Sequence, residues 1–554
     1  MCSGDAINTW AADAIDRVIA RTDARLELFI VDPAVPQRST LGARLKKSVL
    51  LQANLWHLQN KRFPLSAMAP HQPVVRATRW PGVPSRTCQV TLHGKWTQRF
   101  AEPDLAYLRS LDLDFILKFG YGIIRGEILT VARHGVWSFH HDDEQQFRGG
   151  PPALWEIITG APVQAAILQR LTERLDGGVV LDKIWVPTEP RSYRANLSRI
   201  LTASADMPAR AATALRAGRT ERLDAPPVKT DAPIYVAPND VQMVSFGARI
   251  LRNFVEYKRQ NQVMERWNVG VVRAPIHRFL DPDFVPQVEW APYHEPRQFI
   301  ADPFAVPAAD GLRVFCEEFS YETGFGVISE LPWSPTAGWG AVRTVIDEGV
   351  HMSYPYPIVA GGRLRIVPEC SVRSGVPSYR EDAGRMVPDV DVLPGVRLLD
   401  PTIFQHDGRW WMFGTSPDDE PAAKLRLYFG PSEVGPWTSH PANPVKTDVR
   451  NARPAGTPFV HEGRLYRPAQ DCSVTYGGRL VINEVTELTP EHFDEVPIRA
   501  VGPLTESPYP HGFHTLAACG EFTVVDGKRE VLDASLLTYR LKGKLARRFG
   551  LSKR

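Results

Sequence analysis

The sequence predicts a multidomain protein in which an α/β domain, built on a parallel sheet, is followed by an all-β five-bladed β-propeller. With 554 residues the chain is too long for a single hydrophobic core. Helical and short apolar segments alternate up to residue 188, as they do in parallel sheets covered by helices. From residue 269 onward, short strands and turns recur in a repeat of roughly 50 residues, which is typical of propeller blades.

The composition is that of a globular protein in a reducing compartment. Hydrophobic residues make up 43% and charged residues 23% of the chain, both ordinary values for soluble proteins. The six cysteines form no C-x-x-C pair, which argues against a zinc ribbon or a disulfide scaffold. The start, MCSGDAINTW, lacks the regions of a signal peptide, and no apolar run is long enough to span a membrane. A cytoplasmic location is therefore expected.

The first domain is expected over residues 1–188. Its helical patterns and apolar strands alternate, with helices at 6–24 and 126–134 and strands at 25–33, 112–120 and 135–141. The last strand runs into the polar loop HHDDEQQFRGGPP. Because chemistry in parallel sheets sits at the carboxyl ends of strands, this loop is a candidate site. The chain begins almost inside its first helix, so the usual opening strand is expected to be absent.

Residues 189–268 are expected to connect the two folded domains. A polar stretch punctuated by prolines, RAATALRAGRTERLDAPPVKTDAP, reads as an exposed linker. It is followed by a long helix that Asp240 could cap, with Val244, Ile250 and Leu251 at helical spacing.

The propeller is expected over residues 269–530. Each repeat has a polar residue and a proline, an apolar strand, a tight turn and a second, aromatic-rich strand that ends in an acid or polar residue. The five repeats begin at Asp302, Tyr354, Asp400, Arg453 and, more weakly, His514. Residues at the starts of blades converge on the central channel of a propeller, so a ligand is expected there.

The tail, residues 531–554, carries seven basic residues after residue 535 and no acid over that stretch. Its leucines and a phenylalanine recur every four residues, as on one stripe of a helix. Such a basic amphipathic helix could lie on the inner face of an anionic membrane. The alternatives are a solvated tail and a helix docked on its own protein. No basic motif with interleaved aromatics is present, so a nucleic-acid partner is not expected.

Within residues 6–188, a set of spaced residues resembles the formyltransferase family that uses N10-formyltetrahydrofolate. The match is carried by Ser138, His140, Arg148-Gly149, Pro152, Trp155 and Asp176. The resemblance implies a Rossmann-like parallel sheet, with His140 and Asp176 catalytic and Ser138 in place of the family's oxyanion-binding asparagine. FGYGIIRGEIL, residues 119–129, resembles the folate-side loop. The cofactor-binding residues implied are Phe119, Gly120, Tyr121, Gly122, Arg148 and Gly149.

The implied roles agree with the chemistry of formyl transfer. An attacking amine must lose a proton, which a histidine held by a carboxylate can accept. A departure from the family lies at Asp142-Asp143-Glu144-Gln145, where the family has an apolar folate-side segment. Three acids there could bind the ammonium of an amino sugar or a different cofactor. The alternative is a formyltransferase fold that has lost activity and serves as a scaffold.

The propeller region, residues 269–530, resembles glycoside hydrolase family 43. HPANPV and RNARPAGTPFVHEGRLYRPAQD also resemble the N-terminal domain of plant glucosamine inositolphosphorylceramide transferases. In those hydrolases carboxylates at blade starts face a sugar in the channel. The expected carbohydrate-binding residues are Asp302, Glu318, Glu369, Asp400, Arg453, Asp471 and His514, with Glu317 also at a strand end, and no metal is expected. The alternative for each Asp-Pro pair is a turn former.

Three functions remain open at this point. The first is transfer of a formyl group from N10-formyltetrahydrofolate to an amino sugar of a nucleotide sugar, glycan or glycolipid, with the propeller binding the carbohydrate. The second is glycosidase or glycosyltransferase chemistry in the propeller. The third is a non-catalytic carbohydrate-binding protein on a degenerate formyltransferase scaffold.

Overall fold

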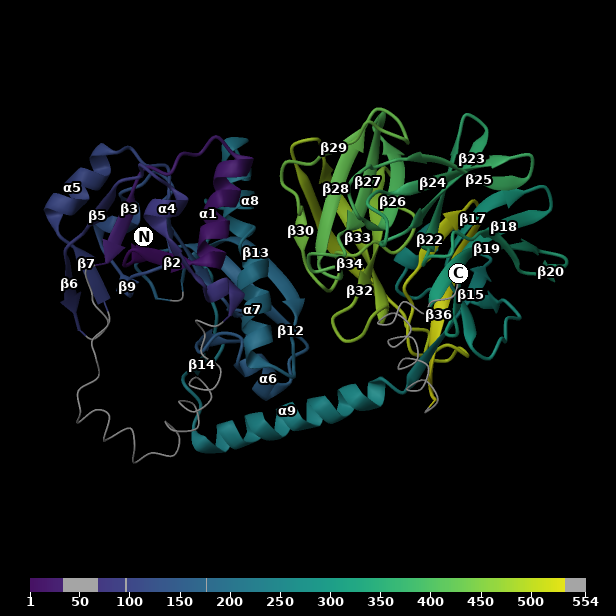
Figure 1. Cartoon of the computed structure of the whole chain (residues 1–554), viewed down its shortest axis with the longest axis horizontal. Coiled ribbons are helices and arrows are strands. Elements are labelled where there is room, and N and C mark those ends of the chain that lie inside the picture. The colour runs from purple at the N-terminus through teal and green to yellow at the C-terminus, as the bar shows by residue number, and fades with distance from the viewer. Residues whose placement is uncertain (33–67, 95–96, 176, 534–554) are drawn as a thin grey trace. The chain divides into compact units, whose positions relative to one another are not determined.

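The computed structural model describes residues 1–32, 68–94, 97–175 and 177–533, and it divides into two compact units, Met1–Phe254 and Val255–Arg554 (Figure 1). Asp176 and nearly all of the basic tail lie outside the described residues. No helix among the described residues is long and apolar enough to cross a membrane.

Unit 1 is built on two small sheets that are joined side by side through an edge strand of each. In the first, β1, β3 and β5 are parallel, and in the second the strand order is β13-β12-β10-β8. The backbone N–H of Phe119, just after β8, donates to the carbonyl of Met1, just before β1, at 2.9 Å and so joins the sheets. The strands are β1 (Cys2–Ser3), β3 (Phe29–Asp32), β5 (Ser85–Thr87), β8 (Ile116–Lys118), β10 (Val136–His140), β12 (Val163–Arg170) and β13 (Val179–Pro187).

Two expectations for this sheet are corrected. An opening strand is present, because β1 pairs in parallel with β3 ahead of the first helix. The sheet is mixed, because β12 and β13 pair antiparallel with their neighbours while β8 and β10 are parallel. The predicted parallel sheet is therefore found only in part. β12, in which five consecutive residues are buried, forms a long hairpin with β13 that continues the core without a crossover helix.

Three helices cover this core. α1 (Thr9–Arg21) buries Trp10, Ala14 and Val18. α7 (Tyr193–Ser204) packs on β12 and β13, and α8 (Met207–Arg216) packs on α1 and β13. The sequence placed α7 and α8 in a connector, but their apolar faces are buried in unit 1.

The smaller elements of unit 1 complete the layer around the sheet. The segment expected to be helical at 126–134 forms only a short 3-10 helix, η3. The remaining elements are β2 (Ala6–Asn8), β4 (Pro73–Val75), β6 (Val90–His93), β7 (Thr97–Phe100), β9 (Ile123–Ile124), β11 (Arg148–Gly149), β14 (Ile234–Tyr235), α4 (Arg76–Arg79), α5 (Glu102–Ser110), α6 (Trp155–Thr159), η2 (Ala69–His71) and η3 (Glu127–Thr130).

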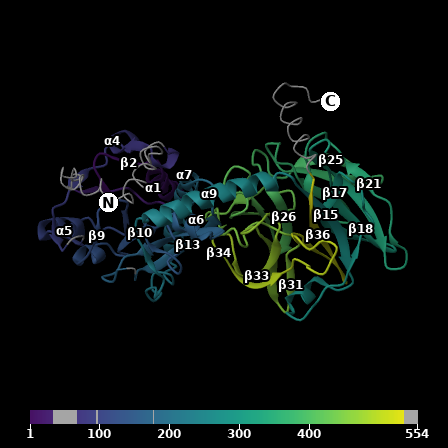
Figure 2. The same ribbon diagram turned by 90° about the horizontal axis from the view of Figure 1, so that it is seen from below.

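The long helix α9 (Asp240–Gln260) is one uninterrupted helix (Figure 2). It was expected to begin with Asp240 as its cap. Instead Asn239 and Gln242 cap it reciprocally: the Gln242 N–H donates to Asn239 Oδ1 at 2.9 Å, and the Asn239 N–H donates to Gln242 Oε1 at 2.8 Å. This is a capping box shifted one residue upstream of the predicted cap.

The described part of unit 2 consists of five antiparallel sheets of four or five strands, arranged as the blades of a propeller. The ring is closed by the two ends of the unit, because β15 and β36 pair over ten residues. The strands are β15 (Val263–Val272), β16 (Val288–Trp290), β35 (Leu516–Cys519) and β36 (Phe522–Leu532) in the closing blade; β17 (Gln298–Ala308), β18 (Gly311–Ser320), β19 (Phe325–Ser334), β20 (Gly338–Trp339) and β21 (Arg343–Ile346) in the next; β22 (Ser353–Ala360), β23 (Arg363–Glu369), β24 (Pro377–Asp382) and β25 (Arg385–Asp391); β26 (Leu399–His406), β27 (Arg409–Thr415), β28 (Lys424–Gly430), β29 (Thr438–Ser439) and β30 (Lys446–Thr447); and β31 (Phe459–His461), β32 (Arg464–Asp471), β33 (Arg479–Leu488) and β34 (Phe493–Val501). A short 3-10 helix, η4 (Ile276–Leu280), follows β15.

Three blades begin with the same irregularity. At Asp302, Tyr354 and Asp400 the backbone takes the left-handed conformation, with φ of 52°, 47° and 49°. The pairing register shifts at each of these points. Such a bulge bends the strand and turns a side chain out of the ladder. The sequence repeat is thus also a repeat of backbone conformation.

Candidate functional site

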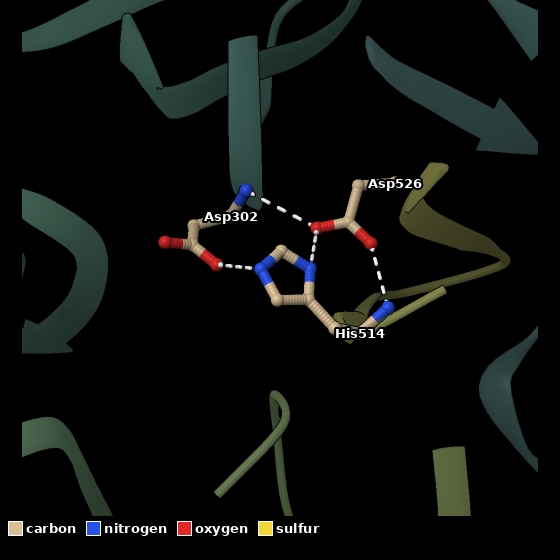
Figure 3. A group of neighbouring side chains, drawn as sticks. All are labelled: Asp302, His514 and Asp526. Carbon is tan, nitrogen blue, oxygen red and sulfur yellow. Dashed lines mark hydrogen bonds and ion pairs between the residues drawn. The ribbon is translucent and has the colours of Figure 1, made fainter. Parts of the chain in front are cut away.

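Asp302, His514 and Asp526 form a buried ion-paired group in the propeller (Figure 3). The imidazole of His514 lies between the two carboxylates, with Nδ1 2.6 Å from Asp526 Oδ2 and Nε2 3.3 Å from Asp302 Oδ1. All three residues are buried. The group joins β17, the first strand of its blade, to β36 of the closing blade.

Asp526 is fixed by the backbone around it. Its Oδ1 accepts the N–H groups of His514 and Thr515 at 2.9 and 3.0 Å, and its Oδ2 accepts the N–H of Asp302 at 3.3 Å. Sequence reasoning missed this residue. The available signal was an acid inside the apolar run FTVVDG, because a charge on a buried strand needs partners.

The protonation states in this group depend on one another. Burial raises the pKa of Asp302 to about 6. Burial also works to lower the pKa of His514, but Asp526 and Asp302 outweigh it and raise that pKa above its ordinary value. The two carboxylates thus favour the imidazolium form of His514.

Asp400 and Arg453 form the second charged pair of the channel. The Arg453 guanidinium donates to both oxygens of Asp400, at 2.5 and 3.2 Å. The amide of Gln470 donates to Asp400 Oδ2 at 3.3 Å, and the Asp400 N–H donates to Glu369 Oε2 at 3.3 Å. Tyr354, at the start of the blade between Asp302 and Asp400, uses its hydroxyl to accept the Gly456 N–H at 2.8 Å.

Two further carboxyl groups, of Glu317 and Glu369, are buried near this pair. Burial, followed by the charges of Asp302, Glu369 and Asp400, raises the pKa of Glu317 well above its usual range. Burial and the neighbouring Asp400 do the same for Glu369, against the opposing effect of Arg453. The channel thus concentrates carboxyl groups whose negative charge is only partly matched by cations.

The structure brings five of the predicted carbohydrate-binding residues together: Asp302, Glu369, Asp400, Arg453 and His514. It places the other two in different surroundings. Glu318 accepts hydrogen bonds from Tyr293 Oη at 3.0 Å and Ser329 Oγ at 2.6 Å. Asp471 accepts from the Ser473 N–H at 2.9 Å and from Arg479 Nε at 2.7 Å.

In unit 1, Ser138 and His140 lie on the same face of β10, because side chains alternate along a strand. Ser138 is buried and His140 is half-buried, with Nε2 3.3 Å from the carbonyl oxygen of Phe147. The predicted partner Asp176 lies outside the described residues. Of the three predicted catalytic residues, the structure therefore describes Ser138 and His140.

The acidic loop after His140 is held by its own chain. Lys183 Nζ lies 2.7 Å from Asp143 Oδ1 and 3.0 Å from Glu144 Oε1. Asp142 accepts the N–H of Ala153 at 3.0 Å and lies beside the fully buried Glu156. Burial raises the pKa of Glu156 to about 7. Two of the three acids that the sequence offered to an external ammonium thus already pair with Lys183.

The loop predicted to face a cofactor packs closely against neighbouring backbone. The Phe119 ring contacts the rings of Trp10 and Phe139, and a Cβ at Gly120 would lie 2.7 Å from the backbone of Cys2. The Gly122 N–H donates to Gln98 Oε1 at 2.5 Å. Tyr121 has a positive φ of 66°.

The predicted cofactor-side residues Arg148 and Gly149 form strand β11, which pairs with β14. Gly149 has φ of 91°, and a Cβ there would lie 2.1 Å from the carbonyl oxygen of Tyr235. Only glycine fits this approach of two strands. The Arg-Gly motif therefore has a structural role in addition to the one its family resemblance implies.

A cavity of about 470 Å³ lies in unit 1, lined by α1 and by residues around the amino ends of β3 and β8. His140 is at the carboxyl end of β10, which runs parallel to β8. The cavity therefore lies at the amino ends of the parallel strands, and the candidate catalytic histidine lies at their carboxyl ends.

Asp302, His514 and Asp526 are also the one group of described residues whose donor atoms, all within 4.8 Å of one another, could surround a metal ion. Those atoms are engaged with each other and with backbone N–H groups. We therefore treat the group as an ion-paired triad and assign it no metal.

Comparison with known proteins agrees with the resemblance of the propeller region. Residues 287–506 match the family described as glucosamine inositolphosphorylceramide transferase 1, N-terminal. Glucosamine inositolphosphorylceramide transferase 1 of rice, Oryza sativa subsp. japonica, is 33% identical over 212 residues, which cover 37% of this chain and 28% of the rice protein. The chain thus matches little more than a quarter of the length of that relative.

Two further likenesses concern separate parts of the chain. Methionyl-tRNA formyltransferase of Prochlorococcus marinus is 32% identical over 85 residues, which cover 15% of this chain and 26% of that protein. A solved structure, the GH43_1 enzyme from Xanthomonas citri, is similar with a TM-score of 0.32 and 14% identity, covering 43% of this chain and 89% of that one.

Proposed function

We propose that this protein is an enzyme of amino-sugar or glycolipid metabolism, in which the propeller binds the carbohydrate and unit 1 transfers a formyl group to a sugar amine. The observation that carries the proposal is the convergence of residues from four blade starts, Asp302, Asp400, Arg453 and His514, on two buried ion pairs. The matches to a glycolipid glucosamine transferase and to a formyltransferase support its two halves.

Carbohydrate binding fits the chemistry of the propeller channel. Sugars are recognised by charged and amide groups that bond to hydroxyls and by aromatic rings that pack against the sugar face. Tyr476 is 41% exposed as a residue, and its ring lies 5.1 Å from the guanidinium of Arg453 and 5.5 Å from the ring of His514. An exposed ring beside a buried polar group is a suitable surface for a pyranose.

In unit 1, each predicted residue has a role in formyl transfer. His140 would accept the proton that the amine loses when it attacks the formyl carbon. Ser138, on the same face of β10, would donate its hydroxyl to the oxyanion that forms at that carbon. Asp176 would orient His140, as the family resemblance implies.

The charges of unit 1 are compatible with N10-formyltetrahydrofolate, whose glutamate tail is anionic. Because Lys183 pairs with Asp143 and Glu144, the acidic loop does not present free carboxylates to that tail. The loop Phe119–Gly122 and the motif Arg148-Gly149 would hold the cofactor, which would supply the formyl group.

The test is an assay of the full chain with N10-formyltetrahydrofolate and a panel of nucleotide-linked amino sugars, with the N-formyl product detected by mass spectrometry. His140→Ala should reduce turnover by about 10²–10⁴-fold, the usual contribution of an acid–base residue. His93→Ala, at an exposed histidine of the same unit, is the matched control. Turnover that is unchanged in His140→Ala would reject the assignment.

A second candidate is glycoside hydrolysis or glycosyl transfer in the propeller. It is favoured by the burial of Asp302 and Glu369, which raises the pKa of Asp302 to about 6 and the pKa of Glu369 well above its usual range. A raised pKa favours the protonated form that a general acid requires. Asp302→Asn should then abolish cleavage or transfer, whereas His140→Ala should leave it intact. If neither activity is detected and sugars still bind, the non-catalytic alternative is correct.

A further inference from the structure

Glu317, which the sequence placed only at the end of a strand, lies at the edge of the buried charged group of the propeller. It sits on β18 opposite Ala301, the residue before Asp302. Its side chain is 9% exposed. The charges that act on it most strongly are those of Asp302, Glu369 and Asp400, which come from three different strands. Its carboxyl group therefore faces the channel side of its strand.

Within the described residues, the Glu317 carboxylate has no hydrogen-bond donor. The nearest candidate is His351, whose Nδ1 lies 3.7 Å from Glu317 Oε1. That nitrogen already accepts the N–H of Gly326 at 3.0 Å, so it carries a lone pair and cannot donate. Burial lowers the pKa of His351, which keeps the ring neutral. The side chain is buried as a whole, but its carboxyl oxygens are not sealed from solvent, so a ligand could supply the donor that the protein does not.

The backbone leaves room for this carboxyl group. Gly326 on β19 faces it, and a Cβ at Gly326 would lie 2.3 Å from Glu317 Oε1 and 2.8 Å from the carbonyl oxygen of Met352. Any residue other than glycine would displace the glutamate. The glycine at position 326 thus provides the space that the carboxyl group of Glu317 occupies.

The surroundings of Glu317 are short of positive charge. The buried carboxyl groups of the channel are those of Asp302, Glu317, Glu369, Asp400 and Asp526. The cations among them are Arg453, bound to Asp400, and His514, bound to Asp302 and Asp526. Glu369 lies 3.8 Å from Arg453, which leaves Glu317 as the member without a cation. A ligand that supplies a positive charge would complete the group.

We propose that Glu317 receives the ammonium group of a sugar, so that the propeller selects carbohydrates that carry a free primary amine. This inference rests on the proposed carbohydrate site and narrows its ligand. An ammonium group is compact and has three donors, so it can bond to Glu317 and to neighbouring oxygens at once. N-acylation would remove the charge and add bulk at the same point.

Burial and the neighbouring carboxylates raise the pKa of Glu317 well above its usual range. This provides a second measurable quantity, the release of protons on binding. A raised pKa favours the protonated carboxyl group in the free protein. Pairing with an ammonium group favours the carboxylate, so Glu317 gives a proton to the solvent to the extent that it was protonated before binding. Binding of an amino sugar should therefore release protons, whereas binding of a neutral sugar through hydroxyls should release none.

The experiment is calorimetric titration of the full chain with the methyl glycosides of glucosamine, galactosamine and mannosamine and of their N-acetylated and 2-hydroxy counterparts. Each titration is run in two buffers of different ionisation enthalpy, which gives the number of protons released. We expect the amines to bind about tenfold or more tightly than their neutral counterparts, as for a buried charge-assisted hydrogen bond.

The variants separate the role of Glu317 from general damage to its strand. Glu317→Gln should weaken amine binding about tenfold or more, abolish proton release and leave binding of the neutral sugars unchanged. Glu318→Gln is the matched control, because the adjacent side chain bonds to Tyr293 and Ser329 instead. Gly326→Ala, which intrudes on the carboxyl group, should reproduce the loss of amine preference.

The outcomes distinguish this inference from the function on which it rests. If amine and neutral sugars bind equally in wild-type protein, the ammonium site is rejected and the carbohydrate site stands. If amines are preferred but Glu317→Gln keeps that preference, the residue is wrongly assigned. If no sugar of the panel binds, the carbohydrate proposal is rejected and this inference is rejected with it.

Discussion

Arg453 holds Asp400 by two hydrogen bonds, from Nε to Oδ2 at 2.5 Å and from Nη2 to Oδ1 at 3.2 Å. The two residues begin successive repeats of the propeller, 53 positions apart in the sequence. Their side chains are 11% and 3% exposed. The pair therefore links two blades at the channel. The negative charge of Asp400 is already paired with the guanidinium of Arg453.

Breaking this pair should destabilise the propeller. Arg453→Met leaves a buried carboxylate without its cation, so we expect the free energy of unfolding to fall by about 3–5 kcal/mol. Urea denaturation followed by tryptophan fluorescence measures the change. The double variant Arg453→Met with Asp400→Leu should recover part of the loss, because no charge is then left unpaired. Equal stability of wild type and Arg453→Met would show that the pair does not hold the blades.

The Asp526 carboxylate should control the charge of His514. Its contact with Nδ1 helps to raise the pKa of His514, so Asp526→Asn should lower that pKa, which imidazole NMR signals recorded across pH would show. A raised histidine pKa stabilises the fold below the unfolded pKa, and this stability is lost as pH rises through the folded pKa. Asp526→Asn should weaken that pH dependence, because Asp302 still raises the pKa of His514.

The control for this prediction is Asp407→Asn. Asp407 is 91% exposed and lies beside another histidine, His406, at 3.5 Å. Its removal should leave the His514 signal unchanged. If the His514 pKa does not move in Asp526→Asn, the ion-paired triad does not exist in solution.

Glu495 should contribute stability that is lost in acid. Burial works to raise its pKa, but Arg467 and Lys446 outweigh this and hold it below the ordinary value. A lowered pKa gives stability that is present above the unfolded pKa and is lost as pH falls through the folded pKa. Glu495→Gln should therefore be less stable than wild type at pH 7, and the difference in unfolding free energy should shrink toward pH 3.

Thermal or urea unfolding over this pH range gives the comparison. Glu484→Gln, at a carboxylate that pairs with the exposed Arg464, is the control. Exposed pairs contribute little, so its effect should stay below about 1 kcal/mol at every pH. A constant difference between Glu495→Gln and wild type at all pH values would contradict the prediction.

Lys183 should decide whether unit 1 accepts an anionic cofactor. Lys183→Met exposes the charges of Asp143 and Glu144, which would repel the glutamate tail of a folate. We expect affinity for a stable N10-formyltetrahydrofolate analogue to fall about tenfold, measured by calorimetry. Lys183→Arg keeps the charge and should bind as wild type does. Unchanged binding in Lys183→Met would place the cofactor away from this loop.

The fold could be predicted largely from local patterns. Residues at blade starts recur in sequence, so Asp302, Asp400 and Arg453 could be picked out as channel residues before any coordinates were known. The strand that carries Ser138 and His140 was also expected at its observed place, since its apolar residues are contiguous. The two-residue strand β1 was missed because it is stabilised by pairing with β3, not by its own pattern.

Residues whose roles depend on distant partners could not be predicted. Glu317 and Glu318 are adjacent acids on one strand, and alternation puts them on opposite faces without telling which face is the channel. Lys183 and Asp143 are 40 positions apart in the sequence. They meet because strand pairing places His140 opposite Ile167 and Ile167 opposite Lys183.

The sequence by itself thus determined the repeat, the blade-start residues and the strand that ends in His140, because these depend on periodicity and on contiguous motifs. The tertiary structure alone decided that Asp526 fixes His514, that Arg453 is bound to Asp400 and that Glu317 lacks a partner. The contacts of Asp302 with His514 and Asp526 depend on closure of the ring, which brings the two ends of the propeller together, whereas the Arg453–Asp400 pair joins two successive repeats. Electrostatic interactions act over a few ångströms of space and are independent of separation along the chain.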